Sequence, residues 1–155
     1  MEPPQNPAPA EGTRLDLMSE QSAPSPTPAA ELSSDPASPL PQEIASALKR
    51  DPSGLVAAIV QQHDTNEVLM LGWMDDEALN RTMTSGRVTF YSRSRQEYWR
   101  KGDTSGNVQF VRSAALDCDA DTLLVSVEQV GPACHTGAHA CFDVHPLTPV
   151  RGQAE

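Results

Sequence analysis

The chain has 155 residues, which suits one domain, and its 21 acids against 11 Lys and Arg give a formal net charge of −10. That sign argues against general nucleic-acid binding, which needs basic side chains to neutralise phosphates. The first 42 residues hold no apolar run long enough for a signal peptide or a membrane span, so we expect a cytoplasmic protein without membrane or nucleic-acid partners.

Residues 1–42 differ in composition from the rest of the chain. They hold ten of the 14 prolines and none of the aromatic side chains. Such a segment cannot bury enough apolar area to offset its ordering entropy, so we predict a disordered Pro/Ala/Ser-rich tail over 1–42. We expect one folded domain over 43–147 and a flexible C-terminus over 148–155.

The domain is predicted to be mainly β with one short helix, an α+β unit that forms a small β-barrel-like domain. Asp75 or Asp76 can cap a helix that ends near Gly86. The first two strand-like runs flank a polar turn and predict a hairpin, and the last two predict another with its tip at 119–121. The strand-like runs are 55–61, 67–74, 87–92, 108–118 and 122–130.

Three carboxylates, Asp117, Asp119 and Asp121, occupy alternate positions at the tip of the second predicted hairpin. Oxygen ligands at this spacing suit a hard cation such as Mg²⁺, although acidic tips without a ligand are common. Strand alternation places Asp117 and Cys118 on opposite faces. The thiol and the acids can therefore belong to different sites.

The three cysteines favour metal binding or thiol chemistry over a role as small buried apolar residues, because disulfides are rare in the cytoplasm. Thiolate and imidazole are the ligands that zinc prefers. Three protein ligands would leave a position open for water, and His135 would then be a candidate general base. His139 as a fourth ligand would instead close the site, and spacing does not decide between the two. The cysteines are Cys118, Cys134 and Cys141.

Residues 92–107, SRSRQEYWRKGDTSGN, combine cations, hydroxyls and two glycines. This mixture is typical of a cradle for phosphate esters, and Tyr98 and Trp99 can stack on a base. A solvated basic loop with core aromatics is the alternative. The residues that we expect to bind substrate are Arg93, Arg95, Trp99, Lys101, Thr104 and Ser105.

Taken together, the order of these pieces resembles the phosphoribosyl-AMP cyclohydrolase family of histidine biosynthesis. The resemblance implies hydrolysis by zinc-bound hydroxide of the adenine N1–C6 bond of N1-(5-phosphoribosyl)-AMP. Opening of the ring would give the phosphoribosylformimino-aminoimidazole carboxamide ribotide. The motifs that carry the resemblance are VLMLGWM (68–74), FYSRSR (90–95), WRKGDTSG (99–106), DCDAD (117–121) and ACHTGAHACF (133–142).

The resemblance also implies the ligands of two metals and a partner. One Zn²⁺ per subunit would be held by the cysteines at 118, 134 and 141, contributed by both chains of an intertwined homodimer. Mg²⁺ would be held by the aspartates at 117, 119 and 121, and His135 would accept or relay the proton. Two positions depart from the family pattern, since Asn107 stands where many members have His and Ala120 where Gly is frequent.

Two other classes of protein share some of these features. A zinc nucleobase deaminase needs His-x-Glu and Pro-Cys-x-x-Cys, and the chain contains neither. A structural zinc module would need a site closed by His139 and would leave the acids without a function.

Overall fold

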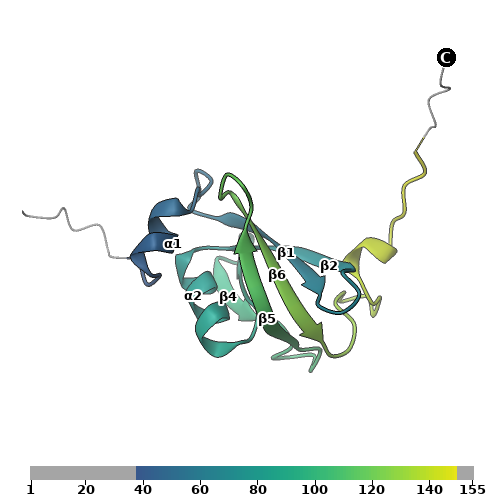
Figure 1. Ribbon diagram of the computed structural model, residues 1–155. Coiled ribbons are helices and arrows are strands. Elements are labelled where there is room, and N and C mark those ends of the chain that lie inside the picture. Colours follow the sequence, from purple (N-terminus) through teal and green to yellow (C-terminus); the bar gives the residue numbers. More distant parts are fainter. Residues whose placement is uncertain (1–37, 150–155) are drawn as a thin grey trace, which may run out of the picture. The chain divides into compact units, whose positions relative to one another are not determined.

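The computed structural model describes residues 38–149 (Figure 1). The predictions for residues 1–37 and 150–155, which cover most of the expected tail and the end of the C-terminus, lie outside the described residues. Within the described range, Leu40 is buried and joins the hydrophobic core.

A four-stranded sheet with the order β2-β1-β6-β5 forms the larger layer (Figure 1). Both predicted hairpins are confirmed, because β1 pairs antiparallel with β2 and β5 pairs antiparallel with β6. The two hairpins join through a parallel pairing of β1 with β6. The strands are β1 Val56–Gln62, β2 Val68–Met74, β5 Gln109–Leu116 and β6 Thr122–Gln129.

A short ribbon and a helix lie on one side of this sheet (Figure 1). The ribbon consists of β3 (Thr89–Ser92) and β4 (Glu97–Arg100), which pair antiparallel. The helix α2 (Asp76–Ser85) begins as predicted, since the Asp75 carboxylate accepts a hydrogen bond from the Ala78 backbone N–H at 2.8 Å. It ends at Gly86, whose φ of 69° is left-handed.

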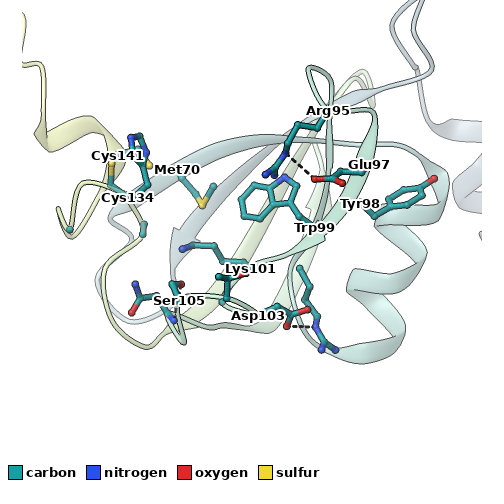
Figure 2. Close-up of a pocket in the computed structure, with 17 residues that line it drawn as sticks. Met70, Arg95, Glu97, Tyr98, Trp99, Lys101, Asp103, Ser105, Cys134 and Cys141 are labelled. Atoms are coloured by element: carbon teal, nitrogen blue, oxygen red, sulfur yellow. Dashed lines mark hydrogen bonds and ion pairs between the residues drawn. The ribbon is translucent and has the colours of Figure 1, made fainter.

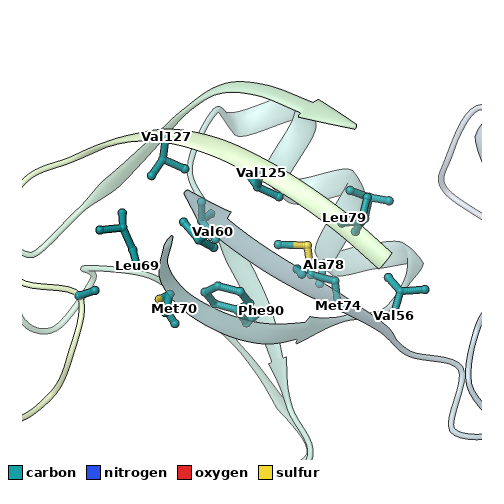
Figure 3. Packing of buried hydrophobic residues seen from close by; sticks show 14 of the residues in the cluster. Val56, Val60, Leu69, Met70, Met74, Ala78, Leu79, Phe90, Val125 and Val127 are labelled. Atoms are coloured by element: carbon teal, nitrogen blue, oxygen red, sulfur yellow. The ribbon is translucent and has the colours of Figure 1, made fainter. Parts of the chain in front are cut away.

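Alternate residues of the central strands form the core between these layers. Val56, Ala58 and Val60 of β1 are buried beside Val125 and Val127 of β6. Figure 3 shows the four valines gathered with Met74, Leu79 and Phe90. This period of two is the pattern of a sheet with one face in the core.

Gly72 lets the ribbon approach β2 closely. A Cβ atom at this position would lie 2.3 Å from a ring carbon of Phe90 on β3. The bare Cα therefore accepts the aromatic ring where a larger residue would push the two layers apart.

Three features differ from the prediction. The structure has a second helix, α1 (Gln42–Ala47), and a 3₁₀ turn, η1 (Cys141–Asp143), besides the one helix expected. Helix α1 buries none of its side chains, so it lacks the apolar periodicity that marks α2. Strand β4 lies in the segment 92–107, where we predicted no strand, and Gln96 at φ 53° makes the turn into it.

The β-barrel-like part of the prediction is not confirmed. The strands of residues 38–149 form a four-stranded and a two-stranded sheet and no closed barrel, and an isolated antiparallel bridge pairs Arg87, before β3, with Phe110 of β5. Across the same residues, no helix combines the length and the apolar composition needed to cross a membrane.

Candidate active site

A cavity of about 680 Å³ opens between strand β4, the loop that follows it and the loop 133–141 (Figure 2). In Figure 2, Cys134 and Cys141 lie together at one end of the cavity and Arg95 and Glu97 lie toward the other. Most of the predicted site residues meet here. Those that line the cavity are Arg95, Trp99, Lys101, Thr104, Ser105, Cys134, His135 and Cys141.

Strand β4 supplies an aromatic face, and Lys101, the residue that follows it, supplies a buried cation. The Trp99 ring packs against Phe90 with a centroid separation of 4.9 Å, which fixes its plane at the cavity wall. Lys101 is only 7% exposed. Burial lowers the pKa of its ammonium, and the charges of Cys141 and Cys134 oppose that shift. A cation held this close to the thiols favours anions at this end of the cavity.

The loop 102–106 continues the wall with exposed hydroxyls. Gly102 at φ 91° and Gly106 at φ 76° allow the backbone to turn back on itself, and the Gly106 N–H donates to the Gly102 carbonyl at 2.9 Å. Thr104 and Ser105 are exposed between them. The loop thus offers hydroxyl donors beside Lys101, which is the chemistry that a phosphate ester needs.

The opposite wall is a tight turn that carries Cys134 and His135. The Ala133 N–H donates to the His139 carbonyl at 3.0 Å, and the Gly137 N–H donates to the Cys134 carbonyl at 3.0 Å. The turn buries the Cys134 side chain and leaves His135 exposed.

The two thiols of this turn differ in acidity. The Thr136 hydroxyl donates to Cys134 Sγ at 3.0 Å, and this hydrogen bond lowers the pKa of Cys134. Burial raises the pKa of Cys141, and the charge of Cys134 raises it further. Cys134 is therefore the thiol that ionises first and the stronger candidate for a soft-metal ligand.

Cys118 lies far from these two cysteines in the same chain. It is exposed in the turn between β5 and β6, whereas the loop 133–141 follows the other end of β6. The eight residues of β6 span about 26 Å. A single chain therefore presents two of its three thiols at the cavity.

The three carboxylates at the tip of this hairpin form a compact group. Oxygen atoms of Asp117, Asp119 and Asp121 lie within 4.8 Å of one another, and all three residues are exposed. The Asp117 carboxylate accepts hydrogen bonds from the backbone N–H groups of Asp121 and Thr122 at 3.1 and 3.2 Å. The group fits a hard cation with oxygen ligands.

The predicted alternation between Asp117 and Cys118 does not apply. Strand β5 ends at Leu116, so both residues belong to the turn and neither follows the two-residue period of a strand. Their side chains are both exposed.

Arg93 does not line the cavity. Its guanidinium lies 4.4 Å from the centre of the Trp73 ring. Trp73 and Asp121 share a second cavity of about 420 Å³. Arg93 therefore lies toward the end of the sheet that carries the acidic tip.

His139 points away from the thiols. Its Nε2 lies 3.0 Å from a Glu67 carboxylate oxygen in the turn between β1 and β2. In this conformation it ties the loop 133–141 to that turn and does not act as a fourth ligand.

The cavity also contains residues that the sequence did not single out for a site. Met70 belongs to a buried apolar run and Glu97 pairs with Arg95 at 3.0 Å, so neither carries a motif of its own. Asn107, identified from the sequence only as a departure, also lines the cavity.

Comparison with known proteins points to one family. The family model for phosphoribosyl-AMP cyclohydrolase matches residues 70–143, which include every residue that lines the larger cavity. A phosphoribosyl-AMP cyclohydrolase of Paenarthrobacter aurescens is 83% identical over 138 residues, which cover 89% of this chain and 100% of the relative. Proteins of the same name from Arthrobacter sp. (strain FB24) and Streptomyces avermitilis are 70% and 71% identical, over 88% and 71% of this chain and 95% and 83% of their own. The chain belongs to the phosphoribosyl-AMP cyclohydrolase family.

Proposed function

We propose that this chain is a phosphoribosyl-AMP cyclohydrolase of histidine biosynthesis, which opens the adenine ring of N1-(5-phosphoribosyl)-AMP by hydrolysis of the N1–C6 bond. The observation that carries the proposal is the cavity, because it joins a histidine, two thiols, an aromatic face and a cationic wall within the residues matched by the family.

The substrate is already activated for attack by water. Ribosylation at N1 makes the adenine ring cationic, so C6 is electron-poor. Water adds to C6 to give a tetrahedral centre, and departure of N1 then opens the ring. His135, exposed on its turn beside the thiols, is placed to accept the proton of the attacking water and to return one to the departing nitrogen.

The remaining walls bind and orient the nucleotide. Trp99 is fixed by Phe90 and offers its face to a planar ring. Arg95, Lys101 and the hydroxyls of Thr104 and Ser105 suit the two phosphate groups of the substrate. An overall acidic chain can bind a ligand with two phosphate groups because its cations are concentrated at this wall.

We propose that a zinc ion is shared between two chains, one ion per subunit. Cys134 and Cys141 of one chain would hold it together with Cys118 of a second chain, because the length of β6, about 26 Å, separates the turn with a chain's own Cys118 from the loop 133–141. The lowered pKa of Cys134 supports this role. Zinc, when bound, supplies a Lewis acid that lowers the pKa of a water molecule to about 7.

The outer face of the four-stranded sheet supports a homodimer of this kind. Ile59 pairs in register with Leu71 and Leu124, and Leu124 pairs with Ala115, so one apolar row crosses all four strands. Leu71 is 45% exposed and Leu124 is 40% exposed. This row crosses β6 at Leu124, the third of its eight residues. A two-fold contact through it would place each hairpin tip near the partner's loop 133–141.

The same arrangement gives the acidic tip a function. Asp117, Asp119 and Asp121 would bring a Mg²⁺ ion to the partner's cavity, where it would neutralise substrate phosphate charge. Arg93 lies at the same end of the sheet and would approach the partner's cavity rather than its own.

A direct assay tests the function. Purified chain with Zn²⁺ and Mg²⁺ should convert N1-(5-phosphoribosyl)-AMP with a change in ultraviolet absorbance, and chelation should abolish the change. His135→Ala should lose activity by about 10²-fold or more. His63→Ala, a change at an exposed histidine outside the cavity, is the matched control and should retain activity.

Zinc content tests the proposed ligands separately. Cys118→Ser should lose zinc and activity together, although the residue lies outside the cavity of its own chain. A Cys118→Ser protein with full zinc content would refute the shared site.

A further inference from the structure

A chain of side-chain amides links the sheet core to the loop 133–141. Gln109 of β5 is fully buried, and its Nε2 donates to Gln129 Oε1 at 2.9 Å. Gln129 Nε2 in turn donates to the backbone carbonyl of His139 at 3.0 Å. The same carbonyl accepts the Ala133 N–H that closes the turn carrying Cys134 and His135.

One end of this series of hydrogen bonds has a polar atom without a partner. Within the described residues, Gln109 Oε1 is buried and accepts no hydrogen bond. A buried amide oxygen in that state is unfavourable, and an apolar residue of similar volume would avoid it. The amide is therefore not explained by packing alone.

The direction of the hydrogen bonds explains the unpaired oxygen. A backbone carbonyl can only accept, so His139 requires the Nε2 of Gln129, and this turns the Oε1 of Gln129 toward Gln109. Gln109 must then present its own Nε2. Its oxygen is left over because both amides present Nε2 to the next acceptor toward the loop, and the Gln109 Nε2 also lies 3.6 Å from Met70 Sδ.

We propose that Gln109 and Gln129 are positioning residues that hold the loop 133–139 so that Cys134 and His135 face the cavity. The catalytic consequence rests on the proposed function, whereas the positioning of the loop does not. Gln129 is fixed at its backbone as well, because its N–H donates to Gln62 Oε1 at 3.1 Å. Its side chain thus joins a rigid strand to the base of the turn.

Gln109→Met is the informative variant, because methionine keeps the apolar volume and removes both the donor and the unpaired oxygen. Packing alone predicts unchanged or increased thermal stability and no change in the loop. Positioning predicts unchanged stability together with about tenfold faster amide hydrogen exchange in a peptide covering 131–141. Exchange over β1, Val56–Gln62, should stay the same.

Gln61→Met is the matched control. Gln61 lies in the same sheet, and its Nε2 donates at 2.8 Å to the Asn66 carbonyl in the turn between β1 and β2. Its loss should leave exchange in 131–141 unchanged. Gln129→Met is the second variant, to be used if Gln109→Met does not fold, and it should loosen the same peptide because it removes the donor to His139.

Kinetics give a further readout on the metal-loaded full chain. Gln109→Met should lower kcat about tenfold with little change in KM, because the substrate contacts of β4 and the loop 102–106 are untouched. Unchanged exchange in 131–141 for both Gln109→Met and Gln129→Met would overturn the positioning. If the wild-type chain shows no turnover, the proposed function fails, and the exchange experiment alone decides the positioning.

Discussion

Ala120 holds a strained backbone at the tip that carries the acids. Its φ of 62° is left-handed, and its carbonyl accepts a hydrogen bond from the Lys49 N–H at 2.8 Å. That conformation is unfavourable for an L-residue by roughly 1–2 kcal/mol. A glycine at this position would adopt the turn without the strain, whereas Ala120 adopts it at this cost.

Ala120→Gly should therefore increase the free energy of unfolding by about 0.5–1 kcal/mol, after the extra flexibility of glycine in the unfolded chain is subtracted. Urea denaturation measures the change. Ala115→Gly, at an exposed position near the end of β5, should destabilise the protein instead. An Ala120→Gly variant that is less stable than the wild type would contradict the inference that the backbone of Ala120 is strained.

Asp76 makes the stability of the fold depend on pH in the acidic range. The Arg50 guanidinium donates to both of its carboxylate oxygens, at 2.6 and 2.7 Å, and the Ser38 hydroxyl also donates to it. The hydrogen bonds from Arg50 are the main reason that the pKa of Asp76 is lowered. A carboxyl with a lowered folded pKa stabilises the protein above its usual pKa of about 3.9 and loses that contribution as pH falls through the folded value.

Asp76→Asn should therefore lower the free energy of unfolding by about 1 kcal/mol at pH 7 and have a much smaller effect near pH 2–3. Denaturation of both proteins across this pH range measures the difference. An equal difference at both ends of the range would show that the ion pair does not stabilise the fold.

At the scale of the elements, one buried hydroxyl joins helix α2 to strand β3. Thr82 Oγ1 accepts the Thr89 N–H at 3.0 Å, and its single proton lies within reach of the carbonyls of Ala78 and Thr89, at 2.8 and 3.1 Å. The residue is 0% exposed. It therefore provides a partner for backbone groups of β3 at the point where α2 covers them.

Thr82→Val keeps the shape but leaves the buried Thr89 N–H without its partner. The free energy of unfolding should fall by about 2 kcal/mol, as thermal or urea denaturation would show. Thr84→Val is the matched control, because Thr84 is exposed and bonds only to the Asn80 carbonyl of its own helix. Equal effects of the two variants would refute the role of Thr82.

The elements also show how far the sequence could predict the fold. Apolar alternation and capping residues predicted both hairpins and α2 because these elements bury one face. Helix α1 buries no side chain and β4 is a mostly exposed ribbon strand, so neither carries a strong apolar pattern. The pairing of β1 with β6 is a contact between distant parts of the chain, which no local pattern records.

The candidate site was predictable in its chemistry more than in its geometry. The segment 92–107 and the motif 133–142 identified most of the residues that meet at the cavity. The order of the predicted strands placed Cys118 at the start of the last hairpin strand and Cys134 after its end, but the spacing of the cysteines alone did not give the distance between them, which depends on the length and straightness of β6. Gln109 was missed for another reason, since a polar residue in a strand-like run has no signal of its own.

For the whole molecule, two inactive variants should restore each other if the site spans two chains. Cys118→Ser and His135→Ala each damage a different half-site. Unfolding and refolding them as an equal mixture should give about a quarter of wild-type activity, because half of the dimers are mixed and each mixed dimer has one intact site.

Each variant refolded alone should stay inactive. The recovery is measured as the activity of the refolded mixture compared with that of each variant refolded alone. Pairing Cys118→Ser with Cys134→Ser should behave in the same way, since these cysteines would come from different chains. No recovery from either mixture would mean that each chain builds its site alone.

The parallel pairing at the centre of the sheet also constrains the order of folding. Strands β1 and β6 are neighbours in space but lie about sixty residues apart in the chain, so the entropy of closing that loop must be met before the sheet is complete. During synthesis, β1 has no central partner until β6 leaves the ribosome. Until then, the edge of β1 that later pairs with β6 has no partner. The nascent chain is most open to wrong strand pairing during that interval.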